Sequence, residues 1–269
     1  SPLDRGFLFG DAIYEVLPVY GGRAYRLDAH LERLNRSLNE IRMPPVMDRA
    51  GWLAALGALV HGNGGGDLLL YVQVTRGVEP ERNHVPRPGA RPTMLAFVSP
   101  LPVIPASLIE RGAAAMTAAD SRWARCDIKA TSLLANVLLR WQAADAQTTE
   151  AILLRDGWLT EGSTSSVHVV RSGRLLTPPQ THAILPGTTR GVLFDLAARE
   201  GIDSERRPVA EVELRGAEEI IIASAGGGIR AVTVLDGAAI GGGNPGPLFR
   251  RLYAGFLATR IEFSTELPA

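Results

Sequence analysis

The chain contains its only lysine in the segment Arg125-Cys126-Asp127-Ile128-Lys129-Ala130-Thr131-Ser132. The other members of its 28 lysine and arginine residues are all arginine, so the need for surface charge does not explain why Lys129 is a lysine. Arginine stays protonated in proteins and forms no Schiff base, whereas a lysine amine serves as a nucleophile or a proton carrier. Lys129 is therefore a candidate for amine chemistry, against the alternative that it is one exposed lysine left by compositional drift.

The length and composition of the chain are those of a soluble globular protein with two domains. Of its 269 residues, 46% are hydrophobic and 21% are charged. A formal net charge of zero gives no support to nucleic acid or an anionic membrane as a partner. No apolar run approaches a membrane span, and no basic and then apolar leader opens the chain. The single cysteine, Cys126, excludes an internal disulfide framework and suits a reducing compartment, so we expect a cytoplasmic protein.

The first hundred residues show both strand and helix periodicity. Alternating and helical patterns predict strands and helices at residues 13–20, 23–27, 28–41, 48–61, 68–75 and 93–98. Asp28 and Asp48 are the expected N-caps of the two helices. A long loop rich in proline and arginine, residues 77–91, separates the last two strands, and loops of that length are commonly functional or mobile.

The proline-rich stretch at residues 100–106 is the expected linker between domains at residues 1–99 and 107–269. Beyond it, the patterns predict elements at residues 132–147, 150–154, 167–176, 188–200, 219–223, 231–235 and 247–262. Strands and helices alternate in both halves. The predicted fold class is therefore α/β or α+β, with two domains.

A lysine that holds an aldehyde cofactor needs a carboxylate to keep the cofactor's ring nitrogen protonated. The candidate is Glu161, which lies at the end of a predicted hairpin and is followed by a glycine and three hydroxyl residues. An acidic residue in a polar turn is otherwise a solvated surface group.

The same cofactor needs an anion site for its phosphate. The segment at residues 185–190 places Gly187 before Thr188 and Thr189 at the start of a predicted helix, where free N–H groups and the positive end of the helix dipole favour an anion. Arg33, expected on the polar face of its helix, would add a bidentate clamp. Simple helix capping and a solvated arginine are the alternatives.

Arg82 and His84 lie two residues apart in the loop at residues 77–91. Alternate residues of an extended chain share a face, so the two side chains are suited to hold a carboxylate together. From the spacing alone, an exposed polar loop is the stronger interpretation.

Other functional classes lack their required patterns. The five histidines and the lone cysteine show no metal-ligand spacing, so no metal is expected. The glycine cluster at residues 62–66 precedes a strand, so the order of strand, glycine loop and helix that a dinucleotide-binding motif needs is missing. The cluster at residues 241–243 is expected to form a loop between a strand and the last helix, and the cluster at 226–228 has no Walker lysine. A serine hydrolase would need a Gly-x-Ser-x-Gly turn, which the sequence does not contain.

Taken together, these stretches resemble the fold type IV pyridoxal-phosphate enzymes, and specifically the D-amino-acid aminotransferases. The matching segments follow the family's order and cover nearly the whole chain, at residues 4–11, 14–16, 30–34, 73–77, 123–129, 160–163 and 185–190. The resemblance implies a two-domain architecture, with a smaller N-terminal α/β domain and a larger C-terminal domain built on a barrel-like sheet.

The resemblance also implies a role for each matching residue, with pyridoxal 5'-phosphate as the cofactor. Lys129 matches the Schiff-base lysine and Glu161 the partner of the pyridine nitrogen. The remaining cofactor-binding residues implied by the resemblance are Arg33, Leu185, Thr188, Thr189, Ser224 and Ala225. The residues implied to bind the substrate α-carboxylate are Tyr14, Arg82 and His84. In that group the arginine and the histidine come from the partner subunit, which implies a homodimer with shared active sites.

The implied reaction is a ping-pong transamination that moves the amino group of a D-amino acid such as D-alanine to a 2-oxo acid such as 2-oxoglutarate. Three other activities occur on the same scaffold: (R)-amine transamination, branched-chain L-amino-acid transamination and aminodeoxychorismate cleavage. A non-catalytic ligand-binding relative is a further alternative, which the joint presence of Lys129, Glu161 and Arg33 disfavours.

Overall fold

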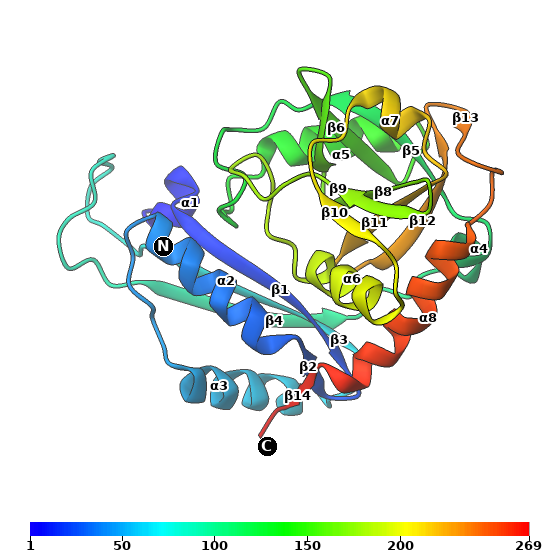
Figure 1. Ribbon diagram of the computed structural model, residues 1–269. Helices are drawn as coiled ribbons and strands as arrows, with labels where there is room; N and C mark the ends of the chain where they lie inside the picture. The colour runs from blue at the N-terminus through cyan, green and yellow to red at the C-terminus, as the bar shows by residue number, and fades with distance from the viewer. Residues whose placement is uncertain (269) are drawn as a thin grey trace. The chain divides into compact units, whose positions relative to one another are not determined.

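The computed structural model describes residues 1–268 (Figure 1). The described chain divides into two compact units. The first contains Ser1–Pro102, Ile128–Leu133 and the C-terminal residues from Arg260, and the second contains Val103–Asp127 and Leu134–Thr259. The segment that carries Lys129 thus packs with the N-terminal part of the chain. The division at residues 99 and 107 expected from the sequence stays a prediction.

Within residues 1–268, the first unit is built on a five-stranded antiparallel sheet in the order β14-β2-β1-β3-β4. The strands are β1 (Ala12–Tyr20), β2 (Arg23–Tyr25), β3 (Leu68–Thr75), β4 (Thr93–Pro100) and β14 (Ser264–Glu266). Successive side chains of a strand point to opposite faces. On β1, Ile13, Leu17 and Val19 are buried in the core, whereas Tyr14 and Val16 lie half-buried on the other face.

The helices of the first unit are α1 (Arg5–Phe9), α2 (Leu27–Glu40) and α3 (Arg49–Gly62). The apolar side of α2, with Leu34 and Leu38 almost fully buried, packs in one core with Ile13 and Leu17 of β1. Asp48 caps α3 as predicted, because its Oδ1 accepts a hydrogen bond of 2.8 Å from the Gly51 N–H.

The expected cap of α2 is wrong. Arg26, in the left-handed region with φ of 55°, stands at the N-cap position of α2, and its side chain makes no capping bond. Asp28 lies in the first turn instead, where its carboxylate accepts a hydrogen bond of 2.6 Å from Arg49 Nε. A negative charge in the first turn still favours the helix through the dipole. The pattern therefore predicts the start of α2 to within two residues, but it does not predict which residue stands at the N-cap position.

Among the described residues, the second unit contains a curled nine-stranded sheet, ordered β10-β9-β8-β11-β12-β5-β6-β7 with β13 paired to β12 (Figure 1). Its strands are β5 (Ala113–Ala119), β6 (Glu150–Arg155), β7 (Trp158–Gly162), β8 (Ser166–Arg171), β9 (Arg174–Thr177), β10 (Ser204–Arg206), β11 (Glu219–Ser224), β12 (Gly228–Leu235) and β13 (Ala238–Ala239). Buried Val169, Ile220 and Val232 from neighbouring strands form part of its core. The expected barrel-like sheet is confirmed.

Helices cover this sheet and complete the second unit. They are α4 (Ala106–Glu110), α5 (Leu134–Asp145), α6 (Thr188–Arg199), α7 (Glu211–Arg215) and α8 (Pro247–Glu262), the last of which continues into the first unit at Arg260. Helix α6 packs against β11. No helix within residues 1–268 is both long enough and apolar enough to cross a lipid bilayer.

Candidate active site

Lys129 lies in a short segment that runs along β1. The Tyr14 N–H donates a hydrogen bond of 3.0 Å to the Lys129 carbonyl, and the Thr131 N–H donates one of 3.1 Å to the Ala12 carbonyl. The Lys129 N–H in turn donates to Ser37 Oγ on α2, at 3.3 Å. With its backbone fixed on both sides, Lys129 places its Nζ 4.2 Å from the centre of the Tyr14 ring. Two of the residues implied by the resemblance are thus in contact.

Behind β1, Arg33 is part of a buried ion cluster. Its Nε and Nη2 donate hydrogen bonds of 2.7 Å to the two carboxylate oxygens of Glu15, and His30 Nδ1 lies 2.7 Å from Glu15 Oε2. Burial would raise the pKa of Glu15, but Arg33 and His30 together hold it well below its usual range. The alternative of a solvated Arg33 on a polar helix face is wrong, because this residue is only 6% exposed, and its role as a phosphate clamp stays a prediction. Glu15 therefore fixes the direction of the arginine.

The long loop that follows β3 carries Arg82 and His84, which are both exposed (Figure 1, cyan). Arg82 lies 4.8 Å from the centre of the Phe9 ring, and the His84 ring centre lies 5.2 Å from the same ring. Arg5 anchors the loop by donating to the Asn83 and His84 carbonyls at 2.6 and 2.9 Å. The structure thus brings Arg82 and His84 together on Phe9, whereas Tyr14 contacts Lys129 and Tyr71.

In the second unit, Glu161 on β7 is a buried carboxylate rather than a solvated turn residue. Its Oε1 accepts a hydrogen bond from Arg122 Nη1, and its Oε2 accepts one of 3.1 Å from the Leu185 N–H. Burial raises the pKa of Glu161 to about 7, although Arg122 and the Leu185 N–H oppose this shift. A carboxylate in this state gains from a further cationic N–H donor, which is what a protonated pyridine nitrogen supplies.

Arg122 and Asp120, which hold Glu161 in place, did not emerge from the sequence analysis. Arg122 Nε and Nη2 donate hydrogen bonds of 2.8 Å to the two oxygens of Asp120, and Thr160 Oγ1 donates to the same carboxylate at 2.8 Å. Arg155 adds an ion pair of 3.0 Å to Asp120. The available signal was the alternation of Asp120 with Arg122 shortly before the lysine segment, but such pairs are common on protein surfaces.

The residues of the predicted anion site at the start of α6 also belong to the second unit. Gly187 is the N-cap of α6 and provides no side-chain cap, so the first-turn N–H groups and the hydroxyls of Thr188 and Thr189 are the polar groups at this helix end. A Cβ on Gly187 would lie 2.6 Å from Ser166 Oγ, so a larger residue there would have to displace the Ser166 side chain. On β11, Ser224 accepts a hydrogen bond of 3.2 Å from the Gly227 N–H in the turn to β12. A buried carboxylate of raised pKa and an uncapped helix start fit a cofactor with a ring nitrogen and a phosphate.

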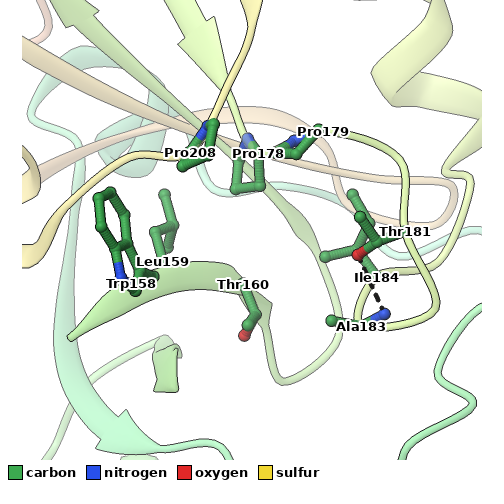
Figure 2. A pocket seen from close by; sticks show the side chains of 9 residues that line it. All are labelled: Trp158, Leu159, Thr160, Pro178, Pro179, Thr181, Ala183, Ile184 and Pro208. Carbon is green, nitrogen blue, oxygen red and sulfur yellow. Dashed lines mark hydrogen bonds between the residues drawn. The ribbon is translucent and has the colours of Figure 1, made fainter. Parts of the chain in front are cut away.

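A separate cavity of about 280 Å³ lies beside Glu161's strand (Figure 2). Its wall is mostly apolar, with Trp158 and Leu159 on one side and prolines 178, 179 and 208 on another. The Thr160 hydroxyl at its edge is already bonded to Asp120. None of the residues implied to bind the cofactor lines this cavity.

Comparison with known proteins shows the family to which the chain belongs. The profile of the family "Amino-transferase class IV" matches residues 12–235. A D-alanine aminotransferase from Bacillus licheniformis is 40% identical over 249 residues, which cover 93% of this chain and 87% of that protein. A D-alanine aminotransferase from Staphylococcus haemolyticus is 34% identical, with 94% of this chain and 89% of that protein covered.

Solved structures agree with this result. The fold IV transaminase of Curtobacterium pusillum superimposes with a TM-score of 0.82 and 28% identity, covering 96% of this chain and 90% of that one. The Escherichia coli branched-chain amino acid aminotransferase has the same fold, with a TM-score of 0.89 at 23% identity over 100% of this chain and 90% of that one. The chain belongs to the class IV aminotransferase family.

Proposed function

We propose that the chain is a pyridoxal-5'-phosphate-dependent transaminase that moves the amino group of a D-amino acid, with D-alanine as the reference substrate, to a 2-oxo acid such as 2-oxoglutarate in a ping-pong reaction. The observation that carries the proposal is Lys129, the only lysine of the chain, with its backbone fixed by Tyr14 and Ser37 and its amine against the Tyr14 ring. The D-alanine aminotransferases that are 34–40% identical over most of the chain support the substrate class.

When bound, the cofactor supplies an electron-withdrawing ring that accepts the electron pair left on the substrate Cα. The Lys129 amine would hold the cofactor aldehyde, and it would also be the base and acid that removes the proton from the substrate Cα and returns it on the cofactor side. Glu161 would keep the ring nitrogen protonated, and Arg122, itself bonded to Asp120, holds Glu161 in position. This fixed electrostatic environment would be the main contribution of the second unit to catalysis.

The phosphate would be held by Thr188, Thr189, Ala225 and Arg33, with Ser224 beside it. The uncapped start of α6 supports this role because free N–H groups and a helix dipole favour a dianion. Leu185 would pack against the ring, and its N–H already orients Glu161.

The substrate α-carboxylate would be bound by Tyr14 together with Arg82 and His84 of a partner subunit, so we also propose a homodimer. Helix α5 supports this, since four apolar residues spaced along one of its faces are exposed: Leu134, Val137, Leu138 and Trp141. An exposed apolar stripe of this kind is typical of an interface. Light scattering should give twice the mass of one chain.

The single cysteine, Cys126, which is buried and forms no disulfide, supports a cytoplasmic location.

A reduction experiment tests the role of Lys129 directly. Because Lys129 is the only lysine, borohydride treatment of the cofactor-loaded enzyme should attach the reduced cofactor to this residue alone. Cleavage after arginine should then place the label on one peptide, residues 126–140. The Lys129→Ala variant should carry no label and lose D-alanine turnover by about 1,000-fold or more, as expected for a covalent and acid–base residue. Unlabelled wild-type enzyme, or a label elsewhere, would contradict the proposal.

Substrate class is tested by spectral titration. Addition of D-alanine should bleach the visible band of the bound cofactor, whereas L-alanine should not. Turnover of D-alanine, L-leucine and (R)-1-phenylethylamine, each with 2-oxoglutarate, then separates the D-amino-acid enzyme from the alternatives on the same scaffold. Faster turnover of L-leucine or of the amine would reassign the substrate.

A further inference from the structure

Gln73 on β3 lies beside the tyrosine that contacts the Lys129 amine. Gln73 and Tyr14 are partners in the antiparallel register of β1 and β3, so their side chains project from the same face of the sheet. The Cβ atoms of such partners are about 5 Å apart. Tyr14 also contacts the Lys129 amine, whose Nζ lies 4.2 Å from the centre of the Tyr14 ring, so Gln73 and Lys129 both neighbour this tyrosine.

Tyr71 fixes the orientation of the Gln73 amide. The Tyr71 hydroxyl donates a hydrogen bond of 2.7 Å to Gln73 Oε1. The Tyr71 ring is itself stacked between Tyr14, at 5.7 Å between ring centres, and Phe97, at 4.8 Å. A hydroxyl on a ring held from both sides has little freedom to leave its partner, so the amide is held in one orientation.

This arrangement leaves the nitrogen end of the amide available. The bond to Tyr71 uses the oxygen, and it is the only hydrogen bond of the Gln73 side chain to residues 1–268. Gln73 and Tyr71 are both half-buried, so the two N–H groups face a partly dehydrated space. Two N–H donors beside Tyr14 favour an anion over a cation.

We propose that Gln73 Nε2 donates a hydrogen bond to the substrate carboxylate and is a further member of the carboxylate site around Tyr14. The inference rests on the proposed function, since it takes the ligand to be an amino acid or a 2-oxo acid. Gln73 is a neutral donor, so it binds the carboxylate without adding a positive charge beside the amine. Both half-reactions use the contact, because D-alanine and 2-oxoglutarate share an α-carboxylate.

The experiment uses the cofactor-loaded enzyme and measures binding as well as turnover. Gln73→Leu removes the donor at similar volume, and we expect it to raise the KM for D-alanine and the Kd for propionate by about 10-fold or more, with kcat within about 2-fold, as expected from the loss of a hydrogen bond to a charged group. Propionate has the carboxylate but no amino group, and its binding is followed by the absorbance of the bound cofactor.

Two further variants test whether propionate binding depends on the charge and on the fixed orientation of the residue 73 side chain. Gln73→Glu puts a negative charge at the same place and should weaken propionate by about 100-fold, more than Gln73→Leu does. Tyr71→Phe leaves the amide in place but releases it, so a smaller loss of about 3-fold is expected. Leu95→Ala is the matched control, since Leu95 is the partner of Gln73 on β4 and shares its face but has no polar atom. That variant should bind propionate like the wild type.

The outcomes separate this inference from the proposed function. An unchanged propionate Kd in Gln73→Leu, with the cofactor band and the thermal midpoint retained, would overturn it. An equal loss in Leu95→Ala would overturn it as well, because the effect would then be general to the sheet face. If the wild type turned over no D-alanine, the proposed function would fail, and the propionate series would still decide whether Gln73 binds a carboxylate.

Discussion

Glu15 in the first unit and Glu161 in the second are both buried and both contact a buried arginine, yet their pKa values move in opposite directions. Glu15 receives two bonds from Arg33 and one from His30, and its pKa lies well below its usual range. Glu161 receives one bond from Arg122 and one from a backbone N–H, and burial raises its pKa to about 7.

The difference shows that one arginine does not by itself keep a buried carboxylate ionised. Arg33 directs both of its bonded nitrogens to Glu15, whereas Arg122 uses Nε and Nη2 for Asp120 and only Nη1 for Glu161. Asp120 also adds a nearby negative charge that raises the pKa of Glu161. Glu15 is a completed structural ion pair, and Glu161 is suited to receive one more donor from a ligand.

The largest expected effect comes from removing the charge of Glu15. Glu15→Gln leaves Arg33 buried without its counter-ion, which should lower the free energy of unfolding by about 3–5 kcal/mol. Glu161→Gln is the matched control, because Arg122 keeps Asp120 as its partner, and it should cost about 1 kcal/mol or less. Urea unfolding of the cofactor-free protein at pH 7.5 measures both. Equal losses would show that the two pairs are equivalent in stability and would break the comparison.

A second test uses pH. The pKa of Glu161 rises on folding from 4.5 to about 7, so the folded state binds more protons than the unfolded state between these values. The contribution of Glu161 to stability is therefore fully present below pH 4.5 and is lost as the pH rises to about 7, a change of up to about 3 kcal/mol. The unfolding free energy of Glu161→Gln should lack this decline. A decline of the same size in both proteins would place its origin in another group.

His168 on β8 extends the comparison to a buried ionisable side chain that has no hydrogen-bond partner among the described residues. Neither of its ring nitrogens has a hydrogen-bond partner among residues 1–268, and burial lowers its pKa to about 3, with Arg190 and Arg206 contributing. Since its ordinary pKa is 6.5, the unfolded state gains the proton first and stability falls as the pH drops below 6.5.

His168→Leu should therefore reduce the loss of stability between pH 7.5 and pH 5 by about 2 kcal/mol. Urea unfolding at the two pH values measures the difference, with wild-type protein as the reference. A variant that loses as much stability as the wild type would show that His168 stays neutral in the unfolded chain or finds a partner in the folded one.

Much of the fold could be predicted from periodicity. The bounds of β3 and α8 agree with the expected ranges, because both have clear apolar patterns bounded by glycine or proline. Strand β5 (Ala113–Ala119) was not predicted. Its sequence is mostly alanine, which favours a helix, and parallel pairing with β12 and β6 overrides that propensity.

The sequence by itself determined the family and named Lys129 as the candidate reactive residue. A single lysine in a chain rich in arginine, an acid before a run of hydroxyl residues and a glycine before two threonines at a helix start are local signals, and each can be detected without knowing what lies nearby in space. These signals named Lys129, Glu161 and the start of α6 as candidate parts of the site.

The tertiary structure alone decided how these groups are supported. The sequence named Arg33 as a candidate phosphate ligand but did not predict its bonds to Glu15 of β1, and Arg122 became a candidate only when the fold brought Glu161 of β7 beside it. Gln73 became a candidate contact only through its register with Tyr14. The physical reason is that burial and partners set the charge and the direction of a side chain, and those partners are distant in sequence and meet only in the folded chain.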